Sequence, residues 1–140
     1  MRVVLDTDVV VAALRSPRGA SAALLRLLDE GGGTLLLSVA LALEYEAVCG
    51  RPEHRLASGL SAVQIEMFVN GVIGLAEPVD TYFLWRPQLH DADDEMVLEV
   101  AVNGRADGIV TFNRKDYGDA PAAFGIAILL PREALKRMKI

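Results

Sequence analysis

Cysteine, histidine and lysine are scarce in this sequence, and long hydrophobic runs are missing. The single cysteine, Cys49, cannot form a disulfide within the chain, which is typical of a protein in a reducing compartment. We interpret Cys49 as a small buried apolar residue. With two histidines and one cysteine, the chain lacks the ligand clusters that zinc prefers. No apolar run reaches about 18 residues and no signal-peptide pattern is present, so we expect a cytoplasmic protein without a membrane span.

The 140 residues are enough for a single domain, residues 1–140, with a substantial hydrophobic core. A hydrophobic fraction of 52% and a mean hydropathy of +0.31 are high for so short a chain. We therefore expect part of the apolar surface to contact a partner. The net charge of -5 argues against nonspecific nucleic-acid binding by the whole surface. Eleven of the fourteen basic residues are Arg, which suits local contacts to phosphate or carboxylate, although ordinary solvated arginines would give the same composition.

Strand patterns and helix patterns alternate along the chain. We expect strands at residues 2–5, 34–37, 109–111 and 126–130. We expect helices at residues 9–14, 20–30, 39–49, 61–72 and 132–139, and another that begins at the acids of 91–95. Residues 51–54 and 117–125 are expected to be loops, and residues 82–85 an edge strand or a packed loop. This alternation predicts an α/β fold, a three-layer α/β/α sandwich with a parallel sheet of four or five strands.

Acidic and amide side chains gather where the expected strands end. Asp6-Thr7-Asp8 follows the first strand, and the polar residues 113–116 follow the strand at 109–111. Four acids also stand within the five positions 91–95, at the expected start of a helix. Ligands of open parallel sheets bind outside the carboxyl ends of the strands, so these clusters could lie at one rim of the fold. Taken singly, the residues of 113–116 are common turn residues.

Glu44 is a further candidate for this rim. It lies about a turn and a half into the helix that Ser38 is expected to cap, so it could face back toward Asp6. Each acid also has an ordinary structural interpretation. Asp8 can cap the helix at 9–14, Asp6 can accept from loop amides, and Glu44 can be a surface acid. Acids such as those of 91–95 are favoured in the first turn of a helix, although four of them exceed what capping requires.

The combination of these acids points to a bound cation. Several carboxylates at one rim repel each other, and their burial is unfavourable unless a cation neutralises them. Oxygen ligands without a His or Cys cluster indicate Mg²⁺ or Mn²⁺. A carboxylate-held Mg²⁺ pair can activate water and stabilise the leaving oxygen of a phosphodiester. Hydrolysis of a nucleic-acid backbone is therefore the chemistry that these side chains would serve best.

Four segments, in this order, resemble the PIN-domain family, and within it the toxin-like branch of VapC-type ribonucleases. They are LDTDVVVAAL at 5–14, LSVALALEYEAV at 37–48, DADDEMVLEVA at 91–101 and ADGIVTFNRKDY at 106–117. The resemblance extends over nearly the whole chain. It implies a parallel α/β/α sandwich and metal-dependent endoribonuclease activity on RNA. It also implies a frequent homodimer and often a cognate protein antitoxin.

The resemblance also implies which acids form the site. Asp6 matches the first acid of the family and Glu44 its helix acid. The third acid falls within 91–95, where we favour Asp94, although counting back from the next motif gives Glu95. By this resemblance the catalytic candidates are Asp6, Glu44, Asp94 and Asp116. The candidate ligands for Mg²⁺ or Mn²⁺ are Asp6, Glu44, Asp91, Asp94, Glu95, Asn113 and Asp116.

One position departs from the common pattern of the family. Asn113 stands where many relatives carry Asp, so Asp116 is the candidate that supplies the missing carboxylate. Asp8 stands where relatives often have Asn, which keeps a polar contact to water or to a metal-bound oxygen possible. A second metal site is therefore in question.

Two other functions compete with the nuclease. A haloacid-dehalogenase-type phosphatase also begins with DxDxV, as residues 6–10 do, but it needs a lysine that this chain lacks before Lys115. A noncatalytic PIN-like module would keep the fold without the metal and use its apolar helices to bind a partner. The helices at 9–14 and 20–30, with Leu24 and Leu28, are the candidates for dimer or antitoxin contacts.

Overall fold

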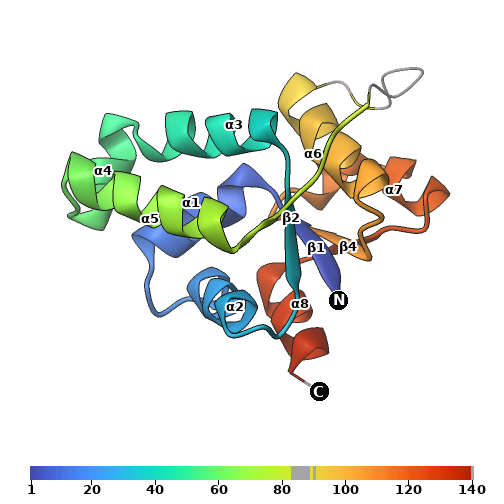
Figure 1. The fold of residues 1–140 in the computed structure, drawn as a ribbon, viewed down its shortest axis with the longest axis horizontal. Helices are drawn as coiled ribbons and strands as arrows, with labels where there is room; N and C mark the ends of the chain where they lie inside the picture. Colours follow the sequence, from blue (N-terminus) through green and yellow to red (C-terminus); the bar gives the residue numbers. More distant parts are fainter. Residues whose placement is uncertain (83–88, 90, 140) are drawn as a thin grey trace.

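The computed structural model describes residues 1–82, 89 and 91–139. Within them, a five-stranded, all-parallel sheet of order β3-β2-β1-β4-β5 is flanked by helices, which confirms the predicted α/β class (Figure 1). The strands are β1 (Arg2–Leu5), β2 (Thr34–Leu37), β3 (Glu77–Pro78), β4 (Gly108–Val110) and β5 (Ala127–Leu129). The helices are α1 (Thr7–Arg15), α2 (Ala20–Asp29), α3 (Val39–Cys49), α4 (Pro52–Ser58), α5 (Ala62–Leu75), α6 (Ala92–Asn103), α7 (Ala120–Ala123) and α8 (Pro131–Met138), with a 3-10 helix η1 (Arg114–Tyr117).

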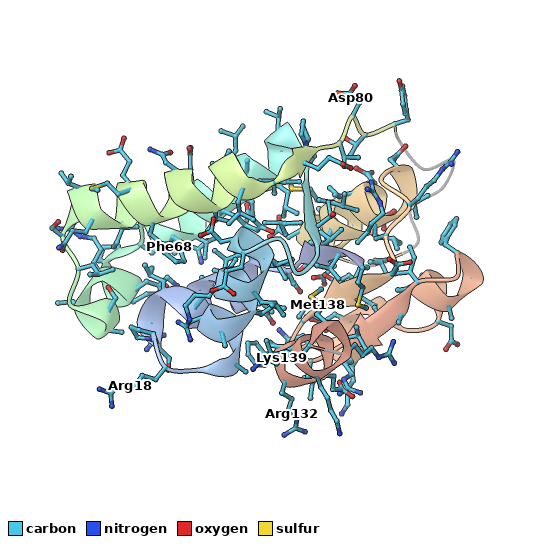
Figure 2. The ribbon with its side chains drawn as sticks, turned by 60° about the horizontal axis from the view of Figure 1, so that its bottom comes forward. Arg18, Phe68, Asp80, Arg132, Met138 and Lys139 are labelled. Carbon is cyan, nitrogen blue, oxygen red and sulfur yellow. The ribbon has the colours of Figure 1, made fainter. Side chains whose placement is uncertain are left out.

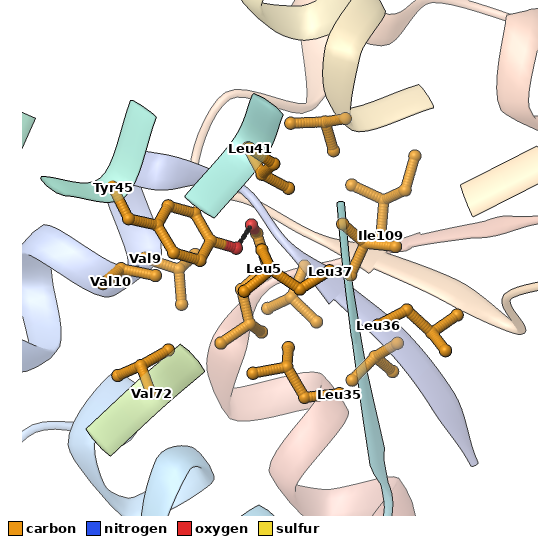
Figure 3. Packing of buried hydrophobic residues seen from close by; sticks show 14 of the residues in the cluster. Leu5, Val9, Val10, Leu35, Leu36, Leu37, Leu41, Tyr45, Val72 and Ile109 are labelled. Atoms are coloured by element: carbon orange, nitrogen blue, oxygen red, sulfur yellow. Dashed lines mark hydrogen bonds between the residues drawn. The ribbon is translucent and has the colours of Figure 1, made fainter. Parts of the chain in front are cut away.

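The central strands are buried on both faces, as expected in a parallel sheet covered by helices. Leu5, Leu36 and Ile109 are fully buried. Figure 3 shows Tyr45 of α3 reaching over this core, where its hydroxyl donates a hydrogen bond to the Leu5 carbonyl. The contact fixes α3 over the end of β1, since a buried hydroxyl without a partner would destabilise the fold.

The chain reverses direction across the sheet between β1 and β4. From β1 it proceeds to β2 and β3 on one side, and it then returns through α6 to β4 and β5 on the other. The registers pair Leu5 with Val110, and the Asp6 amide donates to the Val110 carbonyl at 2.9 Å. The residues that follow these two strands therefore lie side by side at a topological switch point, the usual ligand position of such sheets.

Several helix boundaries differ from the prediction. Asp6 rather than Asp8 caps α1, because its carboxylate accepts from the Thr7 amide at 2.8 Å. The expected loop at 51–54 begins α4, in which proline occupies the first turn, where its missing N–H has no cost. Helix α5 continues through Gly71, because Val72 on its buried face outweighs the roughly 1 kcal/mol that an interior glycine costs.

Two further predictions concern the segments 117–125 and 82–85. The expected loop at 117–125 contains the short helix α7. The edge strand or packed loop proposed for residues 82–85 lies, apart from Tyr82, outside the described residues.

The apolar face of α2 is internal, contrary to our expectation of an interface. Leu24 is fully buried and Leu28 is 5% exposed, because α2 packs against α1 and α8. A hydrophobic stripe is equally suited to the protein's own core and to a partner, so the sequence could not distinguish them. Exposed apolar side chains occur instead on α3 and α5, among them Val39, Leu43 and Met67.

None of the helices in the described residues is, taken alone, long and apolar enough to cross a membrane. Helices α4 and α5 pass such a test only as a pair, bent by 94° and judged by length and composition alone.

Candidate active site

A pocket lies where the carboxyl ends of β1 and β4 meet the first turns of α1 and α6. Helix α3 and the start of α4 complete its wall. Its lining residues are Asp6, Thr7, Asp8, Val11, Glu44, Val48, Arg51, His54, Asp91, Asp93, Asp94 and Asp116. Segments that are far apart along the chain thus bring seven carboxylates to one place.

Asp6 is the most firmly held of these acids. Its Oδ2 accepts from the Thr111 hydroxyl at 2.8 Å and from the Tyr117 hydroxyl at 3.0 Å, while Oδ1 accepts from the Thr7 amide at 2.8 Å. Asp6 is 9% exposed, and this burial raises its pKa, although the Thr111 and Tyr117 hydrogen bonds favour the ionised form. A carboxylate oxygen has two lone pairs, so Oδ1 keeps one acceptor position for a ligand.

Asp8 lies beside Asp6 with one oxygen bonded and the other free. Its Oδ2 accepts from the Asn113 side-chain amide at 2.9 Å and from the Phe112 backbone amide at 3.1 Å. Its Oδ1 is buried and has no hydrogen-bond partner in the described part of the chain. Burial, followed by the charge of Asp6, raises the pKa of Asp8 to about 6. A buried, unsatisfied carboxylate oxygen is the acceptor that a cation or a water would complete.

The first turn of α6 supplies three acids to the pocket. Asp91 caps the helix, with its Oδ1 accepting from the Asp93 amide at 2.8 Å. The pKa of Asp94 is raised to about 6 by burial and then by surrounding negative charges, of which Asp6 is the largest and Asp116 another. Asp94 thus lines the same pocket as Asp6 and Asp116, although it is far from both in sequence.

Glu44 reaches the same pocket from α3. Burial raises its pKa, the nearby charge of Asp93 adds to the increase, and the positive charge of Arg51 opposes it. Glu44 therefore shares the pocket with acids of α6 and with the arginine at the start of α4.

The structure brings together five of the seven candidate ligands and leaves two aside. Asp6, Glu44, Asp91, Asp94 and Asp116 line the pocket, whereas Glu95 and Asn113 do not. The Glu95 carboxylate accepts from the Leu89 amide at 2.8 Å, one helical position away from the pocket. Asn113 uses its side-chain nitrogen as a donor to Asp8. Of the two alternatives left open within 91–95, Asp94 is thus the one that lies in the pocket.

Some residues of the site were not expected from the sequence. Asp8 was noted as part of Asp6-Thr7-Asp8 but not counted as a ligand. Thr111 and Tyr117 hold Asp6, and His54, which belongs to the expected loop at 51–54, lines the pocket. No sequence signal pointed to Tyr117, since a buried phenol needs a polar partner but the sequence does not show that Asp6 provides it.

The donor set fits a hard divalent cation better than zinc. All seven acids offer oxygen, and no cysteine lines the pocket. Within the described residues, no three side chains of the His, Cys, Asp and Glu types are arranged so that they could already hold an ion together. The carboxylates therefore share one pocket without being gathered around one point.

The protein has a parallel sheet with an acid-lined pocket at its topological switch point. These two features place it among α/β proteins with a candidate metal-dependent site. The family model described as PIN domain matches residues 2–115, and the chain belongs to this family. PIN domains are a family of metal-dependent nucleases that typically bind a divalent metal at acidic residues. Searches of curated proteins and of solved structures gave no match.

Proposed function

We propose that this protein is a metal-dependent endoribonuclease that hydrolyses RNA phosphodiester bonds. The observation that carries the proposal is the convergence of Asp6, Glu44, Asp94 and Asp116 on one pocket at the switch point of a PIN-domain chain. Four acids from four separate segments are costly to place together unless they share a ligand. The same four residues are our candidates for catalysis.

Mg²⁺ or Mn²⁺ is the proposed cofactor, and the residues fit it. The open positions on Asp6 Oδ1 and Asp8 Oδ1 are oxygen acceptors, and Asp94 carries a pKa raised by burial and by neighbouring charge. When bound, such an ion supplies the positive charge that lowers the pKa of water and offsets charge on a phosphate. Glu44, Asp91 and Asp116 complete the proposed ligand set.

The surrounding residues have positioning roles in this proposal. Thr111 and Tyr117 fix one oxygen of Asp6, so its other oxygen faces a constant direction. Asn113 and the Phe112 amide do the same for Asp8. Such outer contacts matter because a carboxylate held in one rotamer loses little entropy when it binds its ligand. Asn113 thus serves the site through Asp8 rather than as a ligand.

Metal titration combined with RNA cleavage tests the proposal. We expect Mn²⁺ to bind the wild type, measured by calorimetry, and RNA to be cut only when Mn²⁺ or Mg²⁺ is present. Asp6→Asn and Glu44→Gln should abolish cleavage while circular dichroism shows an intact fold. Cleavage that persists in the purified variants would point to a contaminating nuclease. Absence of binding at millimolar Mn²⁺ would favour the noncatalytic PIN-like module.

We further propose a role as the toxin of a toxin-antitoxin pair, resembling VapC-type ribonucleases, with a homodimer and a protein antitoxin. Support comes from the apolar side chains that α3 and α5 leave exposed, Val39 at 78% and Met67 at 68%. Expression should slow growth, and a small protein encoded next to it should relieve the effect. Growth that is equally slow with Asp6→Asn would contradict toxicity by RNA cleavage.

A further inference from the structure

In the described part of the chain, the start of α4 is the wall of the acidic pocket that carries basic side chains. Arg51 is the N-cap of α4, and His54 lies one turn further along the helix. Both line the pocket together with the seven acids. Helix α4 packs against α1, the helix that begins between Asp6 and Asp8, so its position relative to the acids is fixed by the core.

The Arg51 guanidinium has no assigned partner. No hydrogen bond or ion pair reaches its side chain from the residues that the structure describes. What distinguishes Arg51 from the other unpaired arginines of the described residues, such as Arg18 and Arg55, is its place in the lining of the acidic pocket. Arg51 acts on the pocket through its charge, which opposes the raised pKa of Glu44. All of its donors thus remain available to a ligand.

His54 adds a second unsatisfied group on the same wall. Its side chain is 12% exposed, and its Nδ1 is buried without a hydrogen-bond partner among the described residues. Its Nε2 lies 3.8 Å from the Glu53 carboxylate, outside hydrogen-bond distance. The His54 ring and the Arg51 guanidinium thus place two nitrogen-bearing side chains at this wall of the pocket.

We propose that Arg51 binds a backbone phosphate of the RNA, beside the bond that is cut, with His54 as a neighbouring contact. The proposal rests on the nuclease function above. Seven carboxylates repel a phosphodiester, so the substrate needs a positive group on the protein side that orients it. The planar guanidinium can give two parallel hydrogen bonds to phosphate oxygens, which fixes orientation as well as distance.

A simpler role for Arg51 would be to neutralise Glu44. The two roles differ in their consequences for RNA. A partner of Glu44 would affect the acids and metal binding, whereas a phosphate contact would affect RNA affinity and its dependence on salt. Each phosphate contact on single-stranded nucleic acid contributes about 0.7 to the slope of log affinity against log salt concentration.

Steady-state cleavage of a short, end-labelled, single-stranded RNA in Mn²⁺ tests the proposal. The variants are Arg51→Met, Arg51→Lys and, as control, Arg18→Met. Arg18 is exposed and projects away from the molecule between α1 and α2, beyond the end of α1 that is remote from the pocket (Figure 2). We expect Arg51→Met to raise KM about tenfold or more with a smaller change in kcat. Arg51→Lys should recover part of the loss, and Arg18→Met should match the wild type.

Two further measurements separate a phosphate contact from a structural effect. The slope of log kcat/KM against log salt should become shallower by about 0.7 in Arg51→Met and stay unchanged in Arg18→Met. Calorimetric affinity for Mn²⁺ should not fall in Arg51→Met, since a positive charge has been removed from beside the acids. Equal KM and equal salt slopes in the two Met variants, in a wild type that cuts RNA, would overturn the Arg51 proposal alone. A wild type without cleavage would overturn the nuclease itself, and the Arg51 proposal with it.

Discussion

The amino and carboxyl ends of the parallel sheet differ in whether their charged side chains have partners of opposite charge. At the amino end, the Arg2 amide donates to Asp107 at 2.7 Å, and the Arg2 guanidinium binds Glu77 and the Gly104 carbonyl. At the carboxyl end, among the residues that the structure describes, seven carboxylates share a pocket with one guanidinium, that of Arg51. The same strands therefore carry matched charges at one end and an excess of negative charge at the other.

This difference indicates that the amino end of the sheet contributes to stability, whereas the carboxyl end serves function. Matched charges at the amino end satisfy each other and need no ligand. The acids at the carboxyl end lack such partners, and burial together with like charge raises the pKa of both Asp8 and Asp94 to about 6. We infer that the carboxyl end is destabilising in the metal-free protein and is maintained for the ligand that it binds.

The largest expected effect on RNA cleavage distinguishes Asp94 from its neighbour Glu95, because only Asp94 lies in the pocket at the carboxyl end of the sheet. Asp94→Asn should lower kcat/KM for RNA cleavage by roughly a hundredfold or more, because it removes a proposed ligand. Glu95→Gln should change it only a few-fold, because Glu95 bonds to the Leu89 amide and a glutamine oxygen can still accept. Parallel assays with matched circular dichroism measure the ratio. A greater loss of kcat/KM in Glu95→Gln than in Asp94→Asn would show that Glu95, rather than Asp94, is the ligand.

The next effect concerns pH and metal together. The pKa values of Asp8 and Asp94 are raised from 3.8 to about 6, so the folded protein holds these protons more tightly than the unfolded chain does. Their stabilising contribution is complete below pH 3.8 and is lost as the pH rises through about 6. In chelator, the contribution of these acids to the free energy of unfolding should therefore fall over that range.

Mn²⁺ should reverse this loss. At a hundred times its Kd the ion adds about 2.7 kcal/mol to the free energy of unfolding. Because protons compete for the same oxygens, the rise in Tm should be larger at pH 7.5 than at pH 5. Calorimetric scans with chelator and with Mn²⁺ at both pH values supply the comparison. An equal rise at the two pH values would show that the ion binds elsewhere.

A smaller effect compares one acid from each end in chelator. Asp8→Asn removes a buried charge while its side-chain oxygen can still accept from the Phe112 amide, so we expect a gain of about 1 kcal/mol after allowance for solvent screening. Asp107→Asn weakens the bond from the Arg2 amide and should lower stability slightly. Urea unfolding at pH 7 measures both. Loss of stability in both variants would remove the contrast between the ends.

The fold could be predicted from the sequence because the apolar strand patterns and the acids that follow them indicated the same parallel α/β fold. The apolar strand at 2–5 ends directly at Asp6, and a buried parallel strand followed by an acid has few other interpretations. Membership of the PIN-domain family and the parallel α/β sandwich were both confirmed, whereas the VapC-type branch stays a prediction. The meeting of Asp6, Glu44 and Asp94 followed from the rule that strand ends share a rim, although their roles stay predictions.

Other features could not be obtained from the sequence because they depend on tertiary contacts. Helix α4 has seven residues, none of them buried, so no periodic apolar pattern predicted it. Arg51 and His54 were therefore not connected to the site. The sequence shows a tyrosine at 117 but not that its hydroxyl meets Asp6. Likewise, the choice between Asp94 and Glu95 depends on the rotation of α6 about its axis, which shifts by about 100° per residue.

The smallest expected effect tests the amino end, where Arg2 and Glu77 form an ion pair with side chains 38% and 47% exposed. Glu77→Gln should leave the urea midpoint and RNA cleavage nearly unchanged, because an exposed pair is screened by solvent and the Gly104 carbonyl still accepts from Arg2. Unfolding at low and at high salt is the measurement. If the variant lost much stability at low salt and little at high salt, the amino end would also depend on electrostatics. The carboxyl end would then be distinguished by the sign of its charge interactions, repulsive instead of attractive, rather than by their strength.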